Sequence, residues 1–73
     1  MFSCISYEPL WETLRSRNIN MKEMQKRTGI TKETLSELKK NKAITLETLH
    51  QICDGLGCTV SDVVEINCEM FHI

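Results

Sequence analysis

The sequence lacks the features that mark membrane and secreted proteins. No run of apolar residues approaches the roughly 18 residues that a membrane-spanning helix requires. The first residues have neither the basic start nor the apolar length of a secretion signal. Internal repeats, low-complexity segments and linkers are also absent. A chain of 73 residues with 41% apolar and 26% charged side chains therefore predicts one small globular domain in the cytoplasm, without membrane association.

Basic residues are absent from both ends of the chain. All nine lysines and arginines lie between Arg15 and Lys42, a window with three acidic residues and hence a net charge of +6. The remainder has seven acidic residues and no basic one, a net charge of −7. The overall charge of −1 therefore conceals a basic segment that suits a polyanion. The alternative interpretation of this segment is an ordinary solvated surface.

Residue sets typical of catalysis or metal binding are absent as well. No Ser-His-acid set, phosphate-binding glycine loop or carboxylate pair stands out, so we expect no enzyme activity, cofactor or small-molecule ligand. His50 and Cys53 are three residues apart and Cys58 follows, but a paired CxxC or HxxxH spacing is missing, so no metal site is predicted. Without a secretion signal, the four cysteines are expected to be reduced thiols.

Capping residues and apolar spacing predict five helices and a core between them. The helices are expected from Pro9 to about Arg17, from Asn20 to Gly29, from Thr31 over about 32–40, from Thr45 to about Gly57, and a short one from Ser61. The residues expected to face inward are Leu10, Trp11, Leu14, Met21, Met24, Leu35, Leu38, Leu46, Leu49, Ile52, Cys53, Leu56, Val63 and Val64.

The two ends of the chain, 1–6 and 66–73, contain aromatic and β-branched residues in rough alternation, which is typical of short strands. If these strands pair, the ribbon must lie on the helical body or on a second subunit, because an isolated ribbon is marginally stable. The apolar tail either folds back onto the first residues, or builds a two-fold dimer, or docks another protein. Its apolar residues are Val64, Ile66, Met70, Phe71 and Ile73, and the first residues it would meet are Phe2 and Ile5.

The connection 29–31 between the second and third predicted helices is short enough to force a steep crossing, as in a helix-turn-helix. Gly29 supplies the residue that tolerates a left-handed backbone, and Ile30 supplies the apolar residue that fills the corner. On a helical wheel of about 100° per residue, the third helix turns Leu35 and Leu38 inward. The outward residues are Glu33, Ser36, Glu37 and Lys40, with Lys32 and Lys39 on one flank and Thr34 and Asn41 on the other.

A helix in the major groove of DNA requires short polar residues toward the bases and cations along its flanks. Ser36 and the lysines meet this requirement, and Thr31 with the free amides of the helix start suits a phosphate. The two outward glutamates allow two interpretations. Either carboxylate accepts a hydrogen bond from a cytosine amino group. Otherwise Glu33 complements the helix dipole, and Glu37 pairs with Lys40 on the surface.

The run Thr28-Gly29-Ile30-Thr31-Lys32, followed by Leu35 and Leu38, resembles the turn and recognition helix of the Cro/lambda-repressor class of helix-turn-helix proteins, also called the xenobiotic-response-element class. The segment ITLETLHQICDGLGCTVSDVVE is similar to the fourth and fifth helices of that class. With YEPLWETL near the start, the resemblance covers about residues 7–65. It looks closest to short stand-alone members, including the VanU-type regulators of vancomycin-resistance operons.

The resemblance implies an all-α, five-helix lambda-repressor-like domain, with short terminal strands added from the pattern above. The third helix would enter the major groove and the first would cross the backbone. The base-facing residues would be Lys32, Glu33, Ser36 and Glu37. The phosphate-facing residues would be Thr31, Lys39, Lys40, Asn41, Lys42, Arg15 and Arg17.

Three positions depart from the family pattern. Gln25 stands where the second helix often has alanine, and Met21 and Lys32 stand where many repressors have paired glutamines. No known operator sequence therefore transfers to this chain. The sequence predicts a transcriptional regulator that binds double-stranded DNA through its third helix, with a homodimer through the terminal segments as one arrangement. The alternative function is a protein–protein interaction module, such as an antitoxin or adaptor, that uses the apolar C-terminal tail.

Overall fold

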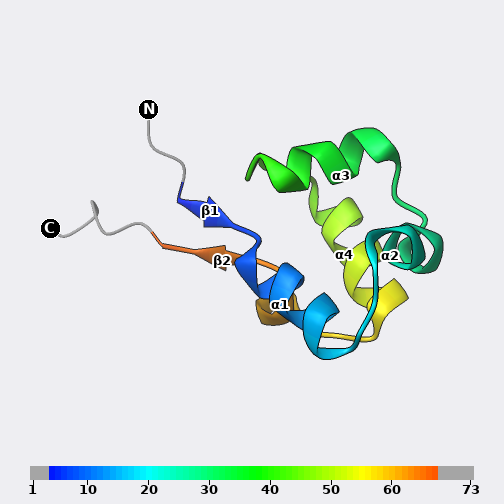
Figure 1. Cartoon of the computed structure of the whole chain (residues 1–73). Coiled ribbons are helices and arrows are strands. Elements are labelled where there is room, and N and C mark those ends of the chain that lie inside the picture. The colour runs from blue at the N-terminus through cyan, green and yellow to red at the C-terminus, as the bar shows by residue number, and fades with distance from the viewer. Residues whose placement is uncertain (1–3, 68–73) are drawn as a thin grey trace, which may run out of the picture.

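The computed structural model describes residues 4–67, which form four α-helices, one short 3-10 helix and a two-stranded ribbon. In chain order these are β1 (Ile5–Ser6), α1 (Glu8–Ser16), α2 (Met21–Thr28), α3 (Lys32–Lys39), α4 (Leu46–Leu56), η1 (Val60–Asp62) and β2 (Glu65–Ile66). The helices form the body, and the two strands lie side by side at its edge (Figure 1). No described helix is long and apolar enough to cross a membrane.

The ends of the middle helices are set by residues that are recognisable in the sequence. Asn20, Thr31 and Thr45 precede α2, α3 and α4, and each side chain accepts a hydrogen bond of 2.8 to 3.1 Å from the backbone amide three residues later. Gly29 and Gly57 end α2 and α4 in the left-handed conformation, with φ of 75° and 65°. The predicted bounds of these helices are confirmed.

The predicted fifth helix is wrong, because the chain forms only the three-residue helix η1 there. The Asp62 carboxylate accepts from the Thr59 amide at 3.2 Å, so the turn begins one residue before Val60 and not at Ser61. Val63 then donates to the Val60 carbonyl at 2.9 Å. The chain cannot continue as an α-helix because the residues that follow pair with β1. The five-helix expectation is therefore corrected to four α-helices and one 3-10 turn.

The two terminal segments pair as an antiparallel ribbon. Ile5 lies opposite Ile66 and Ser6 opposite Glu65, and the Asn67 amide donates to the Cys4 carbonyl at 2.9 Å. This confirms the folding back of the C-terminal segment at these positions. Residues 1–3 and 68–73 of the predicted strands lie outside the described residues. They include Phe2, Met70, Phe71 and Ile73.

The prediction of reduced thiols is wrong for Cys4, which is disulfide-bonded, whereas Cys53 and Cys58 are free. The prediction was based on the absence of a secretion signal and did not consider which cysteines the fold brings close together. The pairing of β1 with β2 places Cys4 beside Asn67.

The core lies between the helices and extends to the start of the ribbon. Its buried apolar residues are Tyr7, Leu10, Leu14, Ile19, Met24, Ile30, Leu35, Leu38, Ile52, Leu56 and Val63. Two residues predicted to face inward do not: Met21 is 38% exposed and Leu46 is 82% exposed. Both are the first residue of their helix. The burial of Tyr7 was not predicted.

Candidate nucleic-acid interface

The turn between α2 and α3 is fixed by short hydrogen bonds. Gly29 donates to the Gln25 carbonyl at 2.7 Å, and the buried Thr28 hydroxyl donates to the Met24 carbonyl at 2.8 Å. Ile30 follows and is buried, as the sequence predicts. The turn therefore fixes the direction in which α3 leaves α2, and this direction decides which face of α3 is exposed.

Two residues of α4, which sequence reasoning missed, support this turn from beneath. The Gln51 side-chain amide donates to the Thr28 carbonyl at 2.8 Å and so pairs a carbonyl at the end of α2. Gly55 lies so close to α2 that an added Cβ would be 2.6 Å from the Arg27 carbonyl oxygen and 2.7 Å from the Thr28 Cα. The absence of a side chain at Gly55 therefore lets α4 pack directly against the end of α2.

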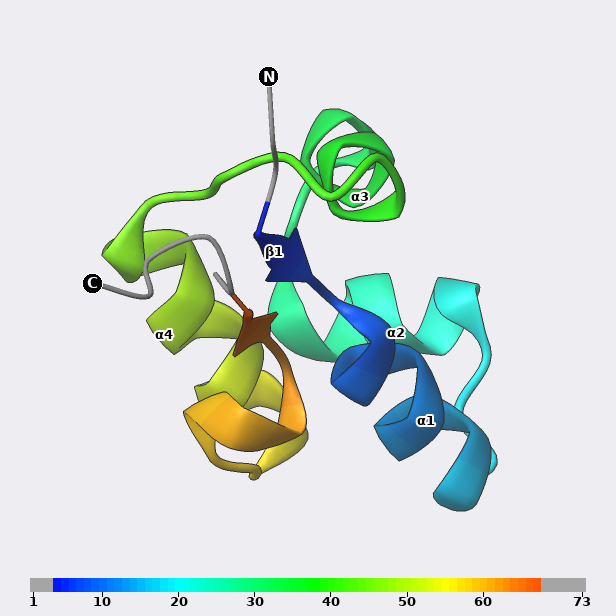
Figure 2. The same ribbon diagram turned by 90° about the vertical axis from the view of Figure 1, so that its left-hand side faces the viewer.

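Helix α3 presents one buried and one exposed side. Leu35 and Leu38 are buried, as predicted, and they hold the helix on the body. The predicted base-facing residues Lys32, Glu33, Ser36 and Glu37, together with Thr31, Lys39 and Lys40, are all exposed. Figures 1 and 2 show α3 at the periphery of the body, the second along its axis. The structure thus brings the predicted base-facing residues onto one accessible helix.

The lysines of α3 are not neutralised by nearby acids. Within residues 4–67 the ion pairing is confined to Glu23 and Arg27, whose side chains approach to 2.7 Å. Glu37 and Lys40 therefore do not form the surface pair that one interpretation of the sequence offered. Their side chains remain in solvent, where the field of the lysines acts on an approaching polyanion.

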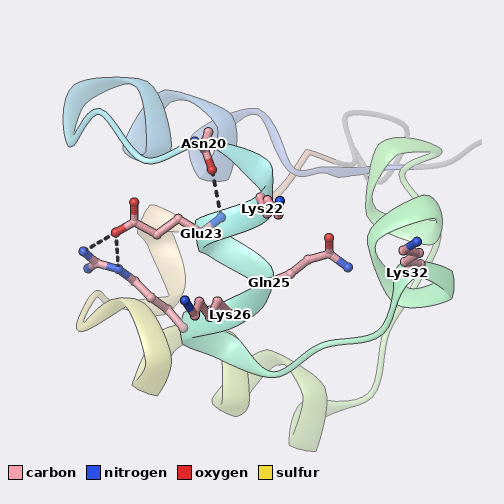
Figure 3. Close-up of a pocket in the computed structure, with 7 residues that line it drawn as sticks. Asn20, Lys22, Glu23, Gln25, Lys26 and Lys32 are labelled. Atoms are coloured by element: carbon pink, nitrogen blue, oxygen red, sulfur yellow. Dashed lines mark hydrogen bonds and ion pairs between the residues drawn. The ribbon is translucent and has the colours of Figure 1, made fainter.

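A hollow between α2 and the start of α3 extends this basic surface. Its lining residues are Asn20, Lys22, Glu23, Gln25, Lys26, Arg27 and Lys32. Lys22 and Lys26 are exposed on α2, and Gln25 points across the hollow toward Lys32 of α3 (Figure 3). Sequence reasoning counted Lys22 and Lys26 within the basic segment but did not assign them to the site. Their four-residue spacing on one face of α2 was the available signal.

The two arginines predicted to approach phosphates lie in different surroundings. Arg15 is exposed and lines a second hollow that shares Asn20 with the first, so its charge adjoins the basic surface. The Arg17 guanidinium instead donates to the Leu56 carbonyl at 2.5 Å, at the end of α4. The structure therefore brings Arg15, but not Arg17, toward the start of α2.

The loop after α3 carries the other predicted phosphate-facing residues and is tied to the start of α1. The backbone of Asn41 is left-handed, with φ of 58°. The backbone amide of Lys42 donates to the Glu37 carbonyl at 3.0 Å, which closes the helix. The Tyr7 hydroxyl donates to the Lys42 carbonyl at 2.6 Å, and the Tyr7 amide donates to Asn41 Oδ1 at 3.3 Å. Tyr7 thereby fixes the position of Asn41 and Lys42 at the end of α3.

Burial raises the pKa of Tyr7, and the nearby Glu37 carboxylate raises it further. Glu37 also lines a hollow with Thr34 and the loop residues before α4. Of the two outward glutamates, Glu37 therefore lies toward α4, whereas Glu33 lies in the first turn of α3.

The described part of the chain contains no group of three or more His, Cys, Asp or Glu side chains able to hold a metal ion. The side-chain chemistry gathered on α2 and α3 is that of lysines, one arginine, hydroxyls and three carboxylates. Such a set binds anions and hydrogen-bonds to polar edges, which is the chemistry of phosphate and base contacts.

The fold and sequence match known DNA-binding proteins. Residues 9–69 match the Cro/C1-type HTH DNA-binding domain. The crystal structure of the transcriptional regulator VanUg, form II, is similar to this chain with a TM-score of 0.81 and 34% sequence identity. The similarity covers 89% of this chain and 87% of that chain. No curated protein matches this chain.

Proposed function

The chain belongs to the Cro/C1-type helix-turn-helix DNA-binding family, and we propose that it is a sequence-specific transcriptional regulator that inserts α3 into the major groove of double-stranded DNA. The observation that carries this proposal is the exposed side of α3, where polar residues lie between unpaired lysines. A helix held by two buried leucines and exposed along its other side fits the groove without rearrangement of the body.

We assign base contacts to the exposed side of α3 and phosphate contacts to its surroundings. The base-facing residues are Lys32, Glu33, Ser36 and Glu37. The phosphate-facing residues are Thr31, Lys39, Lys40, Asn41, Lys42 and Arg15, to which we add Lys22 and Lys26. Arg17 is left out because its guanidinium is engaged with the end of α4. Lys22 and Lys26 are added because they and Lys32 line one hollow.

The dependence of DNA affinity on salt tests this proposal. Each phosphate contact releases counterions, so the logarithm of affinity should fall linearly with the logarithm of salt concentration. The double variant Lys39→Ala with Lys40→Ala should weaken binding and make this slope shallower by roughly 2, since each lost phosphate contact removes about 0.9. Affinity that is weak and independent of salt would overturn the proposal.

A matched control separates contact from net charge. Glu47→Gln with Asp54→Asn changes the net charge by the same magnitude, but with the opposite sign, on α4, where no DNA contact is assigned. This variant should leave the salt slope unchanged. A slope that becomes steeper by an equal amount would show that the overall charge, and not α3, governs binding.

Selection from a randomised duplex library tests the base contacts. Glu33→Gln and Glu37→Gln should each change the preferred base at one position, because a neutral amide replaces an acceptor that pairs with cytosine. Ser61→Ala, on the exposed η1 helix, serves as the control. Unchanged preferences in both glutamine variants would confine the glutamates to roles in the stability of α3.

We also propose that two copies associate through an apolar hollow between α4 and the ribbon. The hollow has a volume of about 140 Å³ and is lined by Ile5, Tyr7, Ala43, Ile44, Leu46, Leu49, Val64 and Ile66. An apolar cavity of roughly 150 Å³ accommodates a benzene ring, so one large apolar side chain fits here. Leu46 and Ile66 stand at its rim, 82% and 68% exposed.

The rim and the hollow are self-complementary, which favours a second copy as the occupant. In a two-fold dimer the same patch meets itself, so Leu46 of each copy would enter the hollow of the other. The patch is small, so the association should be weak and should strengthen when both copies bind adjacent half-sites on DNA.

Sedimentation equilibrium of Leu46→Glu tests the dimer, with Val60→Glu as the matched control. Val60 is also exposed, at 52%, but does not line the hollow. The Leu46 variant should remain monomeric at concentrations where the parent protein and the control associate. A parent protein that stays monomeric, alone and on DNA with two half-sites, would overturn the dimer and favour a different protein as the occupant.

A further inference from the structure

Two free cysteines flank the C-terminal end of α4, away from the surface assigned to DNA. Cys53 lies in the last turn of α4, and Cys58 directly follows the left-handed Gly57. The Cys58 amide donates to the Cys53 carbonyl at 3.0 Å, and the Gly57 amide donates to the same carbonyl. The closure from Cys58 to Cys53 is that of a Schellman motif, in which the flanking side chains contact each other.

The two thiols lie on the positions that such a motif often brings into contact. They are near enough for each to affect the pKa of the other, and both lie partly buried against the core. A disulfide forms without movement of the backbone only where the two cysteines are already close and correctly directed. The helix end therefore brings the two thiols together through hydrogen bonds of the backbone, whatever their oxidation state.

We propose that Cys53 and Cys58 form a reversible dithiol–disulfide site that reacts with low-molecular-weight disulfides of the glutathione class. The thiolate of one cysteine attacks a sulfur of the reagent, whose S–S bond breaks and releases one thiol. The thiolate of the other cysteine then attacks the protein sulfur of the mixed disulfide, forms the Cys53–Cys58 bond and releases the second thiol. The protein loses two electrons and two protons, and the reagent gains both.

The surroundings of the pair predict how its rate depends on pH. Burial raises the pKa of both thiols above the ordinary value, and the Asp62 carboxylate raises both further. The Arg17 guanidinium acts in the opposite direction on Cys58. Because only the thiolate attacks, exchange should be slow near neutral pH and should accelerate as the pH rises.

The position of the pair connects it to the helix-turn-helix. Gly55 lies between the two cysteines in the sequence and packs against the end of α2. A bond between Cys53 and Cys58 would fix the last turn of α4, which supports the turn before α3. The oxidised protein should therefore unfold at a higher temperature than the reduced protein, with its helices in place.

Peptide mapping after oxidation of the full chain tests the proposal. The reduced, folded protein is incubated with oxidised glutathione in mildly alkaline buffer, alkylated, and cleaved by a protease that cuts before aspartate. Asp54 and Asp62 place cleavage sites on both sides of Cys58, and a second digestion after lysine cuts at Lys42 and separates Cys53 from Cys4, so the bond would join the peptide 43–53 to the peptide 54–61. We expect this joined pair without retained glutathione.

The matched control is Cys58→Ser, in which Cys53 should retain glutathione because no second thiol can displace it. The double variant Cys53→Ser with Cys58→Ser, checked for helix content by circular dichroism, should lose the upward shift in unfolding temperature. Glutathione retained on Cys53 or Cys58 of the parent protein would overturn the proposal. A bond from Cys53 or Cys58 to Cys4 or Cys68 would overturn it as well.

Discussion

The α2–α3 segment and the region formed by α4 and the ribbon belong to one small body, but their surfaces differ in chemical character. The first exposes lysines that no acid neutralises within the described residues, whereas the second exposes Leu46 and Ile66 beside Glu47 and Glu65. Helices in both regions begin at a capping side chain and end at a left-handed glycine. Capping and core packing therefore set the fold in both regions, while the exposed residues give the two surfaces different chemistry.

The two regions nevertheless depend on each other through a few contacts. Gln51 and Gly55 of α4 hold the end of α2, and Tyr7 at the start of α1 holds the loop after α3. The orientation of the basic surface is therefore set by residues that carry no positive charge. Substitutions at these residues therefore distinguish effects on the stability of the fold from effects on the chemistry of its surfaces.

Among the substitutions that test contacts between the two regions, Gly55→Ala should have the largest effect on stability. An added methyl group would overlap the backbone of α2, and overpacking of this kind costs up to about 3 kcal/mol. The better helix propensity of alanine offsets about 1 kcal/mol. We expect the free energy of unfolding, measured in urea, to fall by about 2 kcal/mol.

Asp54→Ala is the control for that substitution, because Asp54 is the exposed neighbour of Gly55 in the same helix. It should change the free energy of unfolding by less than about 0.5 kcal/mol. If Gly55→Ala proved as stable as the control, α4 would not pack against α2 as closely as the structure indicates.

Lys22→Ala with Lys26→Ala should come next and should affect DNA affinity but not stability. Both residues are exposed and line the hollow beside Lys32, so their loss removes phosphate contacts without opening the core. The salt slope should become shallower by roughly 2, measured by fluorescence anisotropy at several salt concentrations. An unchanged slope would restrict the interface to α3 and the loop after it.

Tyr7→Phe should have a smaller effect, which reaches both regions. It removes the 2.6 Å hydrogen bond to the Lys42 carbonyl while the ring remains in the core. The free energy of unfolding should fall by about 1 kcal/mol, and DNA affinity should fall because Lys42 is no longer held. Both are measured on the same preparation, by urea unfolding and by anisotropy.

Thr13→Val is the matched control for Tyr7→Phe. The Thr13 hydroxyl donates to the Asp62 carbonyl at 2.8 Å, which is also a long-range bond from a side chain to the backbone. That bond lies between α1 and η1, away from α3, so its loss should cost similar stability and leave DNA affinity unchanged. Equal losses of affinity in the two variants would mean that stability alone explains the effect of Tyr7.

The parts of the fold that the sequence predicts correctly are those with local causes. The caps at Asn20, Thr31 and Thr45 and the turn at Gly29 and Ile30 each depend on a few neighbouring residues, and all five are found in the structure. The inward side of α3 also follows from local spacing, because Leu35 and Leu38 are three residues apart.

The parts that the sequence does not predict depend on contacts between distant segments. Gln51 and Gly55 act on a turn more than twenty residues earlier in the chain, and the engagement of Arg17 with Leu56 joins α1 to the end of α4. The expected fifth helix fails for a similar reason, because strand pairing with Ser6 competes with it at Glu65. The contacts of Gln51, Gly55 and Arg17 leave no periodic pattern in the sequence.

Leu46 is one of the two residues that the sequence predicts to face inward and the structure exposes, and its substitution should have the smallest effect on the isolated fold. Leu46→Ser removes a side chain that is 82% exposed, so the free energy of unfolding should change by less than about 0.5 kcal/mol. Leu56→Ala, at a position 4% exposed on the same helix, should cost about 2 to 5 kcal/mol and calibrates the measurement. If Leu46→Ser instead destabilises the protein, the loss should grow with protein concentration, because only burial against a second copy removes this side chain from water. A loss that is independent of concentration would place Leu46 in the core of a single chain and would remove the rim from the proposed dimer.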